Sequence, residues 1–388
     1  MRIAILGYGT VGKGLVEMIE GNKEKRNIEI TNILVRNKDK YKSSKYSDKI
    51  TENIEDVFNT DIDILVELMG GLHPSYEYIK RALENKINVV TANKDMLAEY
   101  GDKLVKISKD NKVSLRFEAS VGGGIPVLKP LTESLEGNDI ESVYAILNGT
   151  TNFILSKMYD EGLPYEEVLK EAQDLGFAEA NPEADVEGYD AARKLSILST
   201  LAYHRRVYWK DFYLEGISNI DMKDIDYAKK MGCKIKLVGQ SRKNDKTVSG
   251  FVRPVLVDNN SLLSKIDNEY NIVVLNGNSV GELSFVGKGA GKEPTGSAVY
   301  SDLIDILDKR ISNIDSFMKD KIEVEKTISS NCQVLLRFKS PKKEEIIEDN
   351  DELAIMVYAD SEYEINNILC LIKDKGYCKE SRKILKIS

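Results

Sequence analysis

The sequence predicts an α/β protein that begins with a doubly wound parallel sheet and continues into a central α+β domain and a small final α+β unit. An apolar strand at residues 2–6 is followed by a glycine turn, a helical pattern at about 11–19 and a second strand. Such a βαβ unit is typical of parallel sheets. The length of 388 residues predicts more than one domain, since one domain takes about 150 residues.

Strand-like and helical patterns alternate as far as about residue 117, which predicts the doubly wound sheet. From residue 126 the helices are longer, and a run of acids and lysines at 339–351 sets the last part of the chain apart. The expected strands lie at residues 28–35, 64–66, 88–91, 113–117, 140–147, 233–239, 334–338, 353–358 and 384–387, and the expected helices at 75–84, 94–109, 126–135, 152–159, 165–175, 189–203, 297–307 and 362–375.

Charge and cysteine content narrow the class of protein. The net charge of −8 comes from 63 acidic and 55 basic residues mixed along the chain, which predicts no nucleic-acid-binding face. Cys233, Cys332, Cys370 and Cys378 lack metal-type spacing, so we interpret them as reduced thiols. The N-terminal apolar run is shorter than a signal-peptide core, and no segment approaches about 18 uninterrupted apolar residues. We expect a cytoplasmic protein that does not bind a membrane.

The glycine turn after the first strand predicts a nucleotide site. Gly7, Gly9 and Gly12 are spaced so that backbone amides and a helix N-terminus can meet a pyrophosphate. A tight turn of purely structural purpose is the alternative, but the position inside the first βαβ unit favours binding. After the second strand, Arg36 stands where an acid would bind a ribose 2′-hydroxyl, and an arginine there pairs with a 2′-phosphate. This favours NADP(H) over NAD(H), unless Arg36 is an ordinary exposed cation.

Residues 176–194 predict a second site, which together with the nucleotide site suggests a dehydrogenase. Asp190 and Lys194 are four residues apart at the start of an apolar helical pattern, so both point to one side of the helix. A protonated lysine there can stabilise an alkoxide and deliver the proton when a nicotinamide reduces a carbonyl. The alternative is an exposed ion pair worth about 0.3–0.5 kcal/mol. His73 and His204 have no acid or nucleophile at useful spacing, which argues against a histidine relay.

Five segments in order, at residues 90–94, 118–126, 147–152, 178–194 and 287–295, make the chain resemble the homoserine dehydrogenase family from residue 1 to about 312. The resemblance implies NAD(P)H-dependent, reversible reduction of L-aspartate 4-semialdehyde to L-homoserine, in the route to threonine and methionine. It also implies association through the second domain, as a homodimer or a higher oligomer. One departure is Asn181, where the family usually has an aspartate.

The resemblance implies a role for each matched residue. Lys194 is the acid/base, and Lys94, at the carboxyl edge of the parallel sheet, faces cofactor and substrate, although by itself it would pass for the first lysine of a surface helix. Substrate contacts are expected from Glu179, Asp185, Asp190, Gly149 and Thr150; cofactor contacts from Gly7, Gly9, Thr10, Val11, Gly12, Arg36, Gly70, Lys94 and Gly291; and a monovalent cation such as Na⁺ from Glu118 and the carbonyls of Val121, Gly123 and Ile125.

The expected domains are a Rossmann-type nucleotide domain at residues 1–130 with a return helix at about 295–312, a catalytic and dimerisation domain at 131–294, and a degenerate ACT-like domain at 322–388. Feedback by threonine through this last domain is an open hypothesis, which a thermal-shift titration without response to threonine would oppose. Two alternatives were weighed. A phosphorylating semialdehyde dehydrogenase needs a mid-chain cysteine nucleophile and none precedes Cys233. A non-catalytic nucleotide and amino-acid sensor would leave Glu179, Asp190 and Lys194 without a purpose.

Overall fold

The computed structural model describes residues 1–326, 332–339, 352–359, 366 and 380–387. The chain divides into two compact units, each of which takes several segments of the sequence. The first unit comprises Met1–Val143, Arg193–Trp209 and Asn271–Ile322. The second comprises Tyr144–Ala192, Lys210–Tyr270 and Glu323–Ser388.

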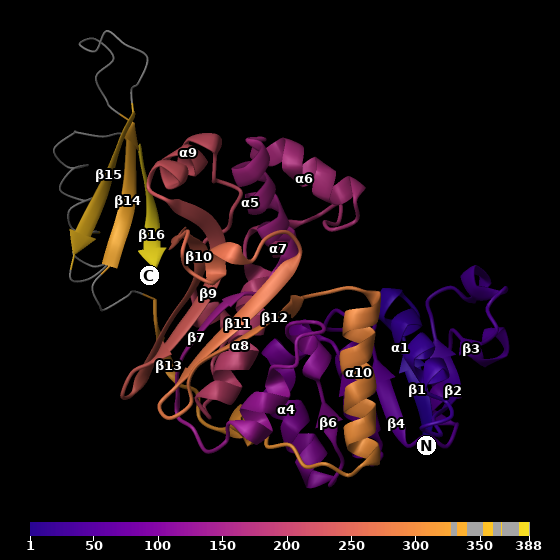
Figure 1. Ribbon diagram of the computed structural model, residues 1–388. Helices are drawn as coiled ribbons and strands as arrows, with labels where there is room; N and C mark the ends of the chain where they lie inside the picture. The colour runs from indigo at the N-terminus through magenta and orange to yellow at the C-terminus, as the bar shows by residue number, and fades with distance from the viewer. Residues whose placement is uncertain (327–331, 340–351, 360–365, 367–379, 388) are drawn as a thin grey trace. The chain divides into compact units, whose positions relative to one another are not determined.

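The first unit contains a six-stranded parallel sheet in the order β3-β2-β1-β4-β5-β6, which confirms the predicted doubly wound sheet (Figure 1). The strand order reverses on either side of β1, so the carboxyl ends of β1 and β4 form the switch point at which open α/β sheets bind ligands. The strands are β1 (Arg2–Leu6), β2 (Glu29–Leu34), β3 (Ile50–Thr51), β4 (Ile64–Glu67), β5 (Asn88–Thr91) and β6 (Leu115–Arg116).

Helices connect these strands, and two of them begin after an asparagine whose side chain caps the helix. Asn53 caps α2 (Ile54–Phe58), and Asn93 caps α4 (Lys94–Asp110) by accepting from the Met96 amide at 3.1 Å. This capping satisfies a backbone donor that the first helical turn leaves free. The remaining helices of the sheet are α1 (Thr10–Gly21) and α3 (Ser75–Glu84).

A helix from late in the sequence, α10 (Lys292–Leu307), lies beside α1 in the same unit (Figure 1). Leu15, Ile19, Val299 and Leu303 are among the buried residues that join these helices to the sheet in one hydrophobic core. The helix starts five residues before the predicted residue 297. Gly291, with a φ of 119°, is its N-cap residue.

The first unit also contains the end of the predicted helix 126–135, which begins later than expected. Helical structure starts at Leu128 and continues as a π-helical turn, Pro130–Ser134. The amides of Val127, Leu128 and Lys129 donate to the Glu118 carboxylate, and this side chain therefore fixes the start of the helix. Strands β11 (Tyr270–Gly277) and β12 (Gly281–Lys288) follow in the chain as neighbours, with β12 at the end of its sheet.

The second unit combines helices with a mixed sheet. Strand β9 (Cys233–Lys243) pairs antiparallel with β10 (Thr247–Asp258), which the sequence analysis did not predict. β10 also pairs in parallel with β8 (Tyr213–Leu214), β13 (Glu323–Glu325) and β16 (Glu380–Ile387). The helices of this unit are α5 (Gly149–Glu161), α6 (Tyr165–Asp174), α7 (Glu183–Val186) and α9 (Met222–Lys230); α8 (Tyr189–Ala202) begins here and continues into the first unit.

The strands predicted near the C-terminus are confirmed. β14 (Cys332–Lys339) pairs antiparallel with both β15 (Glu352–Ala359) and β16. The helix predicted at residues 362–375 lies outside the described part of the chain, except for residue 366.

Candidate active site

The three glycines after β1 serve different physical purposes. A Cβ at Gly7 would lie 2.7 Å from the Leu68 carbonyl oxygen, and one at Gly12 would collide with the Gly7 carbonyl, so both positions need glycine for packing within the turn. A Cβ at Gly9 would meet nothing within 4 Å. Because Gly9 has no side chain, the space in front of the first turn of α1 stays open. A ligand such as a pyrophosphate can therefore approach the protein backbone closely there.

Two helix N-termini lie close together beside this turn. Gly9 and Gly291 are the N-cap residues of α1 and α10, and neither offers a side-chain capping bond. The helices approach closely because Gly14 packs against the Lys292 backbone and Gly296 against the backbone of Gly14. Uncapped helix N-termini present free amides and a partial positive charge, which suits a phosphate group.

A buried carboxylate, Glu67, organises the loops that follow β4 and β5. It accepts hydrogen bonds from the amides of Met69 (2.8 Å) and Gly70 (3.1 Å) and from the hydroxyl of Thr91 (2.6 Å). Asn93 extends the network by donating to the Gly71 carbonyl at 2.6 Å. Glu67 is not among the predicted site residues, although an acid at the end of the apolar run Ile-Leu-Val is a signal of a buried, bonded carboxylate.

Two predicted cofactor residues border this network. Gly70 has a φ of 72°, and a Cβ there would meet nothing within 4 Å. Lys94 is the first residue of α4, directly after the capping Asn93. Arg36 lies exposed two residues beyond the end of β2, and within residues 1–326 no described hydrogen bond or ion pair engages its guanidinium.

In the second unit, Asn148 brings two predicted carboxylates together. Its amide nitrogen donates to Asp185 at 2.7 Å and to Asp190 at 2.9 Å, while its oxygen caps α5 by accepting from the Thr151 amide at 2.8 Å. Asn148 and Asp190 are buried. This cap is the reason that α5 starts at Gly149, three residues before the predicted start. The role of Asn148 as the link between the carboxylates was missed.

The other residues predicted for the substrate are placed as follows. The Thr150 hydroxyl donates to the Phe177 carbonyl at 2.6 Å, and Gly149 lies against the Glu269 backbone. Glu179 is exposed, and within residues 1–326 no described hydrogen bond joins it to the Asn148 amide that holds Asp185 and Asp190. Asn181, the departure from the family pattern, accepts from the Glu183 amide at 3.3 Å at the start of α7.

A buried lysine on β9, Lys236, holds the first turn of α5 in place, and it was not predicted from the sequence. Lys236 on β9 donates to the Asn152 side chain (3.0 Å), the Ile266 carbonyl (2.7 Å) and Asp267 (2.9 Å). Asn152 in turn donates to the carbonyls of Ile266, Asn268 and Tyr270. Burial lowers the pKa of Lys236, and its contact with Asp267 opposes that shift. No local pattern indicates that Lys236 is buried, because a lysine in a strand is usually exposed.

Asp190 and Lys194 stand one turn apart on α8, as predicted. Lys194 is half-buried, and the next residue, Leu195, is fully buried. The preceding residue, Arg193, pairs with Asp95 on α4. Each of the two predicted catalytic lysines, Lys94 and Lys194, is therefore adjacent in sequence to one member of this ion pair.

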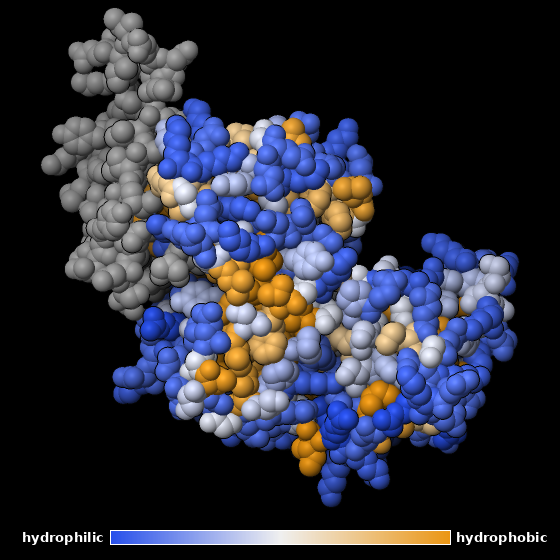
Figure 2. Space-filling model, viewed as in Figure 1, coloured by the Kyte–Doolittle hydropathy of each residue, from blue (hydrophilic) through white to orange (hydrophobic). Residues whose placement is uncertain are grey.

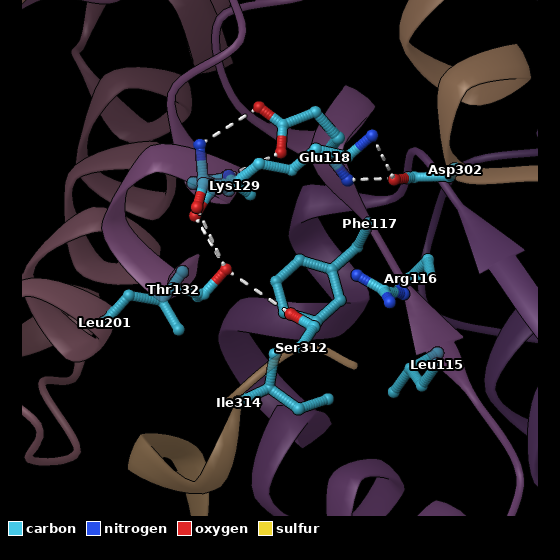
Figure 3. A pocket seen from close by; sticks show the side chains of 11 residues that line it. Leu115, Arg116, Phe117, Glu118, Lys129, Thr132, Leu201, Asp302, Ser312 and Ile314 are labelled. Carbon is cyan, nitrogen blue, oxygen red and sulfur yellow. Dashed lines mark hydrogen bonds and ion pairs between the residues drawn. The ribbon is translucent and has the colours of Figure 1, made fainter. Parts of the chain in front are cut away.

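Glu118 lies in a buried network of charges in the first unit. Its carboxylate accepts from the amides of Val127 (2.7 Å), Leu128 (3.0 Å) and Lys129 (2.8 Å), and its own amide donates to Asp302 on α10 at 2.8 Å. Figure 3 shows Glu118, Lys129 and Asp302 lining a pocket from separate elements. Burial, together with the Glu118 carboxylate, raises the pKa of Asp302 to about 8. Burial also raises the pKa of Glu118, against the three amide bonds.

The loop after Glu118 contains the carbonyls predicted to bind a cation. Val121, Gly123 and Ile125 are buried, and no hydrogen bond described for residues 1–326 ends on their carbonyl oxygens. The Ile125 amide donates to the neighbouring Gly122 carbonyl at 2.8 Å. Buried carbonyls without donors are suited to a hard cation with oxygen ligands.

Models of protein families match most of the chain. A model described as the NAD binding domain of homoserine dehydrogenase matches residues 7–118, and one described as homoserine dehydrogenase matches residues 126–304. Among curated relatives, a homoserine dehydrogenase of Bacillus subtilis is 42% identical over 315 residues, which cover 79% of this chain and 73% of the relative. One of Neisseria gonorrhoeae is 42% identical over 313 residues, which cover 79% and 72%.

Solved structures agree with these matches. A homoserine dehydrogenase from Thiobacillus denitrificans superposes with a TM-score of 0.92 at 33% identity, covering 100% of this chain and 98% of that one. The S. aureus enzyme gives 0.80 at 34% identity, with coverage of 100% and 98%. A hyperthermophilic archaeal homoserine dehydrogenase in complex with NADPH gives 0.69 at 27% identity, covering 80% of this chain and 99% of that one.

Proposed function

Because the chain belongs to the homoserine dehydrogenase family, whose members reduce L-aspartate 4-semialdehyde to L-homoserine reversibly with a nicotinamide cofactor, we propose a role in this reaction for each residue of the site. The chain is thus an oxidoreductase with a nicotinamide-binding domain at its N-terminus. The observation that carries the assignment of roles is the placement of Asp190 and Lys194 one turn apart on α8, with Asp190 bonded to Asn148.

The bound nicotinamide supplies the hydride in this reaction. Lys194 stabilises the negative charge that forms on the substrate oxygen and delivers the proton. Asp190, held by Asn148 together with Asp185, binds the substrate ammonium group, and Glu179 provides a further carboxylate for it. Thr150 and Gly149 in the first turn of α5 position the substrate, and Lys94 faces both cofactor and substrate.

We propose that the cofactor is NADP(H), with NAD(H) as the weaker alternative. In support, the uncapped N-termini of α1 (Thr10, Val11) and α10 (after Gly291) and the open space at Gly9 suit a pyrophosphate, and Gly7, Gly12 and Gly70 shape the surrounding turns. Arg36 is exposed after β2 and free to pair with a 2′-phosphate. The archaeal relative was solved in complex with NADPH, which is compatible with this proposal.

Replacing Arg36 by serine is expected to raise the KM for NADPH by about 10- to 100-fold, since a hydrogen bond to a charged group contributes about 1.5–3 kcal/mol. The KM for NADH should change little, because NADH has no 2′-phosphate. Steady-state oxidation of each cofactor with aspartate semialdehyde measures both values. Lys40→Ser, in the same exposed segment, is the control. A wild-type enzyme that uses NADH as efficiently as NADPH contradicts the proposal.

We also propose that Val121, Gly123 and Ile125 bind Na⁺ through their carbonyls, with Glu118 nearby. The carboxylate of Glu118 already accepts three amide bonds, so its part is to fix the loop rather than to supply most of the ligands. Sodium chloride should then raise the melting temperature more than choline chloride at equal ionic strength. Identical curves in the two salts would oppose a cation site.

The oligomeric state is proposed to be a homodimer or a higher homo-oligomer formed through the central domain. In support, β12 ends its sheet, and Figure 2 shows apolar side chains gathered over the β11 and β12 region. Val286 on β12 is 50% exposed. A long edge strand with exposed apolar side chains is suited to a second copy of the chain. Sedimentation that detects only a 43.6 kDa species would refute this.

The domain boundaries at residues 130, 294 and 322 and the ACT-like character of 322–388 remain proposals. The pairing of β14 with β15 and β16 is compatible with such a unit. In the described residues, no helix is both long and apolar enough to cross a membrane.

A further inference from the structure

Each of the two proposed catalytic lysines has, as its neighbour in the sequence, one member of the same ion pair. Asp95 comes directly after Lys94, and Arg193 directly before Lys194. The Arg193 Nη1 atom lies 3.4 Å from the Asp95 Oδ1 atom, and the side chains are 23% and 33% exposed. The pair therefore connects the first turn of α4 to α8 at the positions from which both lysines project.

The guanidinium of Arg193 is held on a second side by an aromatic ring. It lies 4.7 Å from the ring centre of Trp209, the one tryptophan in the sequence. A cation over a tryptophan face is attracted by the ring quadrupole and loses mobility. The ring thus keeps Arg193 directed toward Asp95, and its fluorescence reports on this arrangement.

A second arginine attaches α4 one turn further along. Arg206 is buried and donates to the Ala98 carbonyl at 2.6 Å and to the Leu97 carbonyl at 3.4 Å. Its guanidinium lies 5.0 Å from the ring centre of Phe317, and that ring occupies the space which the missing side chain of Gly101 leaves free. Residues 193–209 therefore contact α4 at two successive turns, through Arg193 and through Arg206. Two such contacts restrain the orientation of the helix as well as its position.

We propose that Arg193 is a positioning residue, whose ion pair with Asp95 sets the position of Lys94 relative to Lys194. The two arginines have different roles. Arg206 is deeply buried and belongs to the packing of the unit, whereas Arg193 is partly exposed and close to the lysines. Loss of Arg193 therefore removes the link between the first turn of α4 and α8, and leaves the Asn93 cap and the packing further along α4 in place. This inference rests on the proposed roles of Lys94 and Lys194.

The test uses the full-length enzyme with Arg193→Ala, Arg193→Lys and Asp95→Asn. Arg193→Ala is expected to lower kcat by about 100-fold, the effect of a displacement of about 1 Å at reacting groups. The KM for NADPH should stay near the wild-type value, because the cofactor turn after β1 is untouched. Asp95→Asn should give a similar loss, and the double variant no more than either single one, since both remove the same contact.

Rescue of kcat, tryptophan emission, the melting temperature and a control variant together separate positioning from a general loss of structure. Millimolar guanidinium added to Arg193→Ala should restore part of kcat, and Arg193→Lys should restore part of it through its charge. The emission of Trp209 should change in Arg193→Ala while the melting temperature stays close to that of the wild type. Arg81→Ala breaks a two-bond ion pair with Glu55 at 2.6 and 2.8 Å on the same unit and should leave kcat unchanged.

The outcomes distinguish this inference from the proposed function. If folded Arg193→Ala and Asp95→Asn both keep wild-type kcat while Lys194→Ala is inactive, the positioning role is overturned and the function stands. If Lys194→Ala itself keeps wild-type kcat, the proposed chemistry fails. If Arg193→Ala does not fold, Asp95→Asn decides, because it retains the arginine on Trp209.

Discussion

Replacing Lys194 by alanine is expected to lower kcat for aspartate semialdehyde reduction by about 10³-fold, within the range that a positioned general acid contributes. Alanine can neither stabilise the alkoxide that forms on the substrate nor donate a proton to it. The dissociation constant of NADPH should be nearly unchanged, because the interaction is made only as charge develops on the substrate. Stopped-flow hydride transfer and fluorescence titration with NADPH measure the two quantities separately.

A lysine in a comparable helical setting supplies the control. Lys106 pairs with Asp110 four residues later on α4 at 2.9 Å, with both side chains exposed. Lys106→Ala should leave turnover at the wild-type level, since an exposed pair of this kind contributes little even to stability. Equal loss in Lys106→Ala and Lys194→Ala would indicate a general effect of removing lysines and would end the acid/base assignment.

Replacing Gly14 by alanine is expected to lower the free energy of unfolding by about 2–3 kcal/mol through overpacking. A methyl group there meets the backbone carbonyl of Lys292, which has no rotamer with which to avoid it. Because α10 then moves away from α1, the uncapped N-terminus at Gly291 moves as well, and the KM for NADPH should rise. Urea unfolding measures the first effect and steady-state kinetics the second.

Gly21, in the same helix, allows the same substitution without the collision. No atom lies within 4 Å of a Cβ built at Gly21. Gly21→Ala should therefore be neutral or stabilising by up to about 1 kcal/mol, from helix propensity alone. If Gly14→Ala is as stable as Gly21→Ala, α1 and α10 are not in the close contact that the structure shows.

The parallel sheet was predictable because its signals are local. The strands at residues 64–67 and 88–91 contain the apolar runs Ile-Leu-Val and Val-Val, and α3 and α4 follow with helical periodicity, so their bounds agree with the predicted ones to within one residue. By contrast, β10 was not predicted. It contains Gly250 and Pro254, which weaken a strand pattern, and its stability comes from pairing with β9 and three further strands that no local pattern reveals.

The candidate site was predictable as residue types but not as connections. The spacing of Asp190 and Lys194 identifies a shared helix, yet the bond from Asn148 to Asp190 joins positions 42 residues apart. The burial of Lys236 and the bond from Thr91 to Glu67, 24 residues apart, were missed for the same reason. A charged residue is buried only when distant groups supply its hydrogen bonds, and those partners are visible only in three dimensions.

The Glu67 network has a consequence for how the enzyme can evolve. Its carboxylate and Asn93 fix the backbone that leads into Lys94, whereas the exposed Arg36 has no described bond to this framework in residues 1–326. Selection could therefore exchange one coenzyme for the other by changes in the segment around Arg36 alone. Turnover would be inherited intact, because the framework under the reacting groups is not altered.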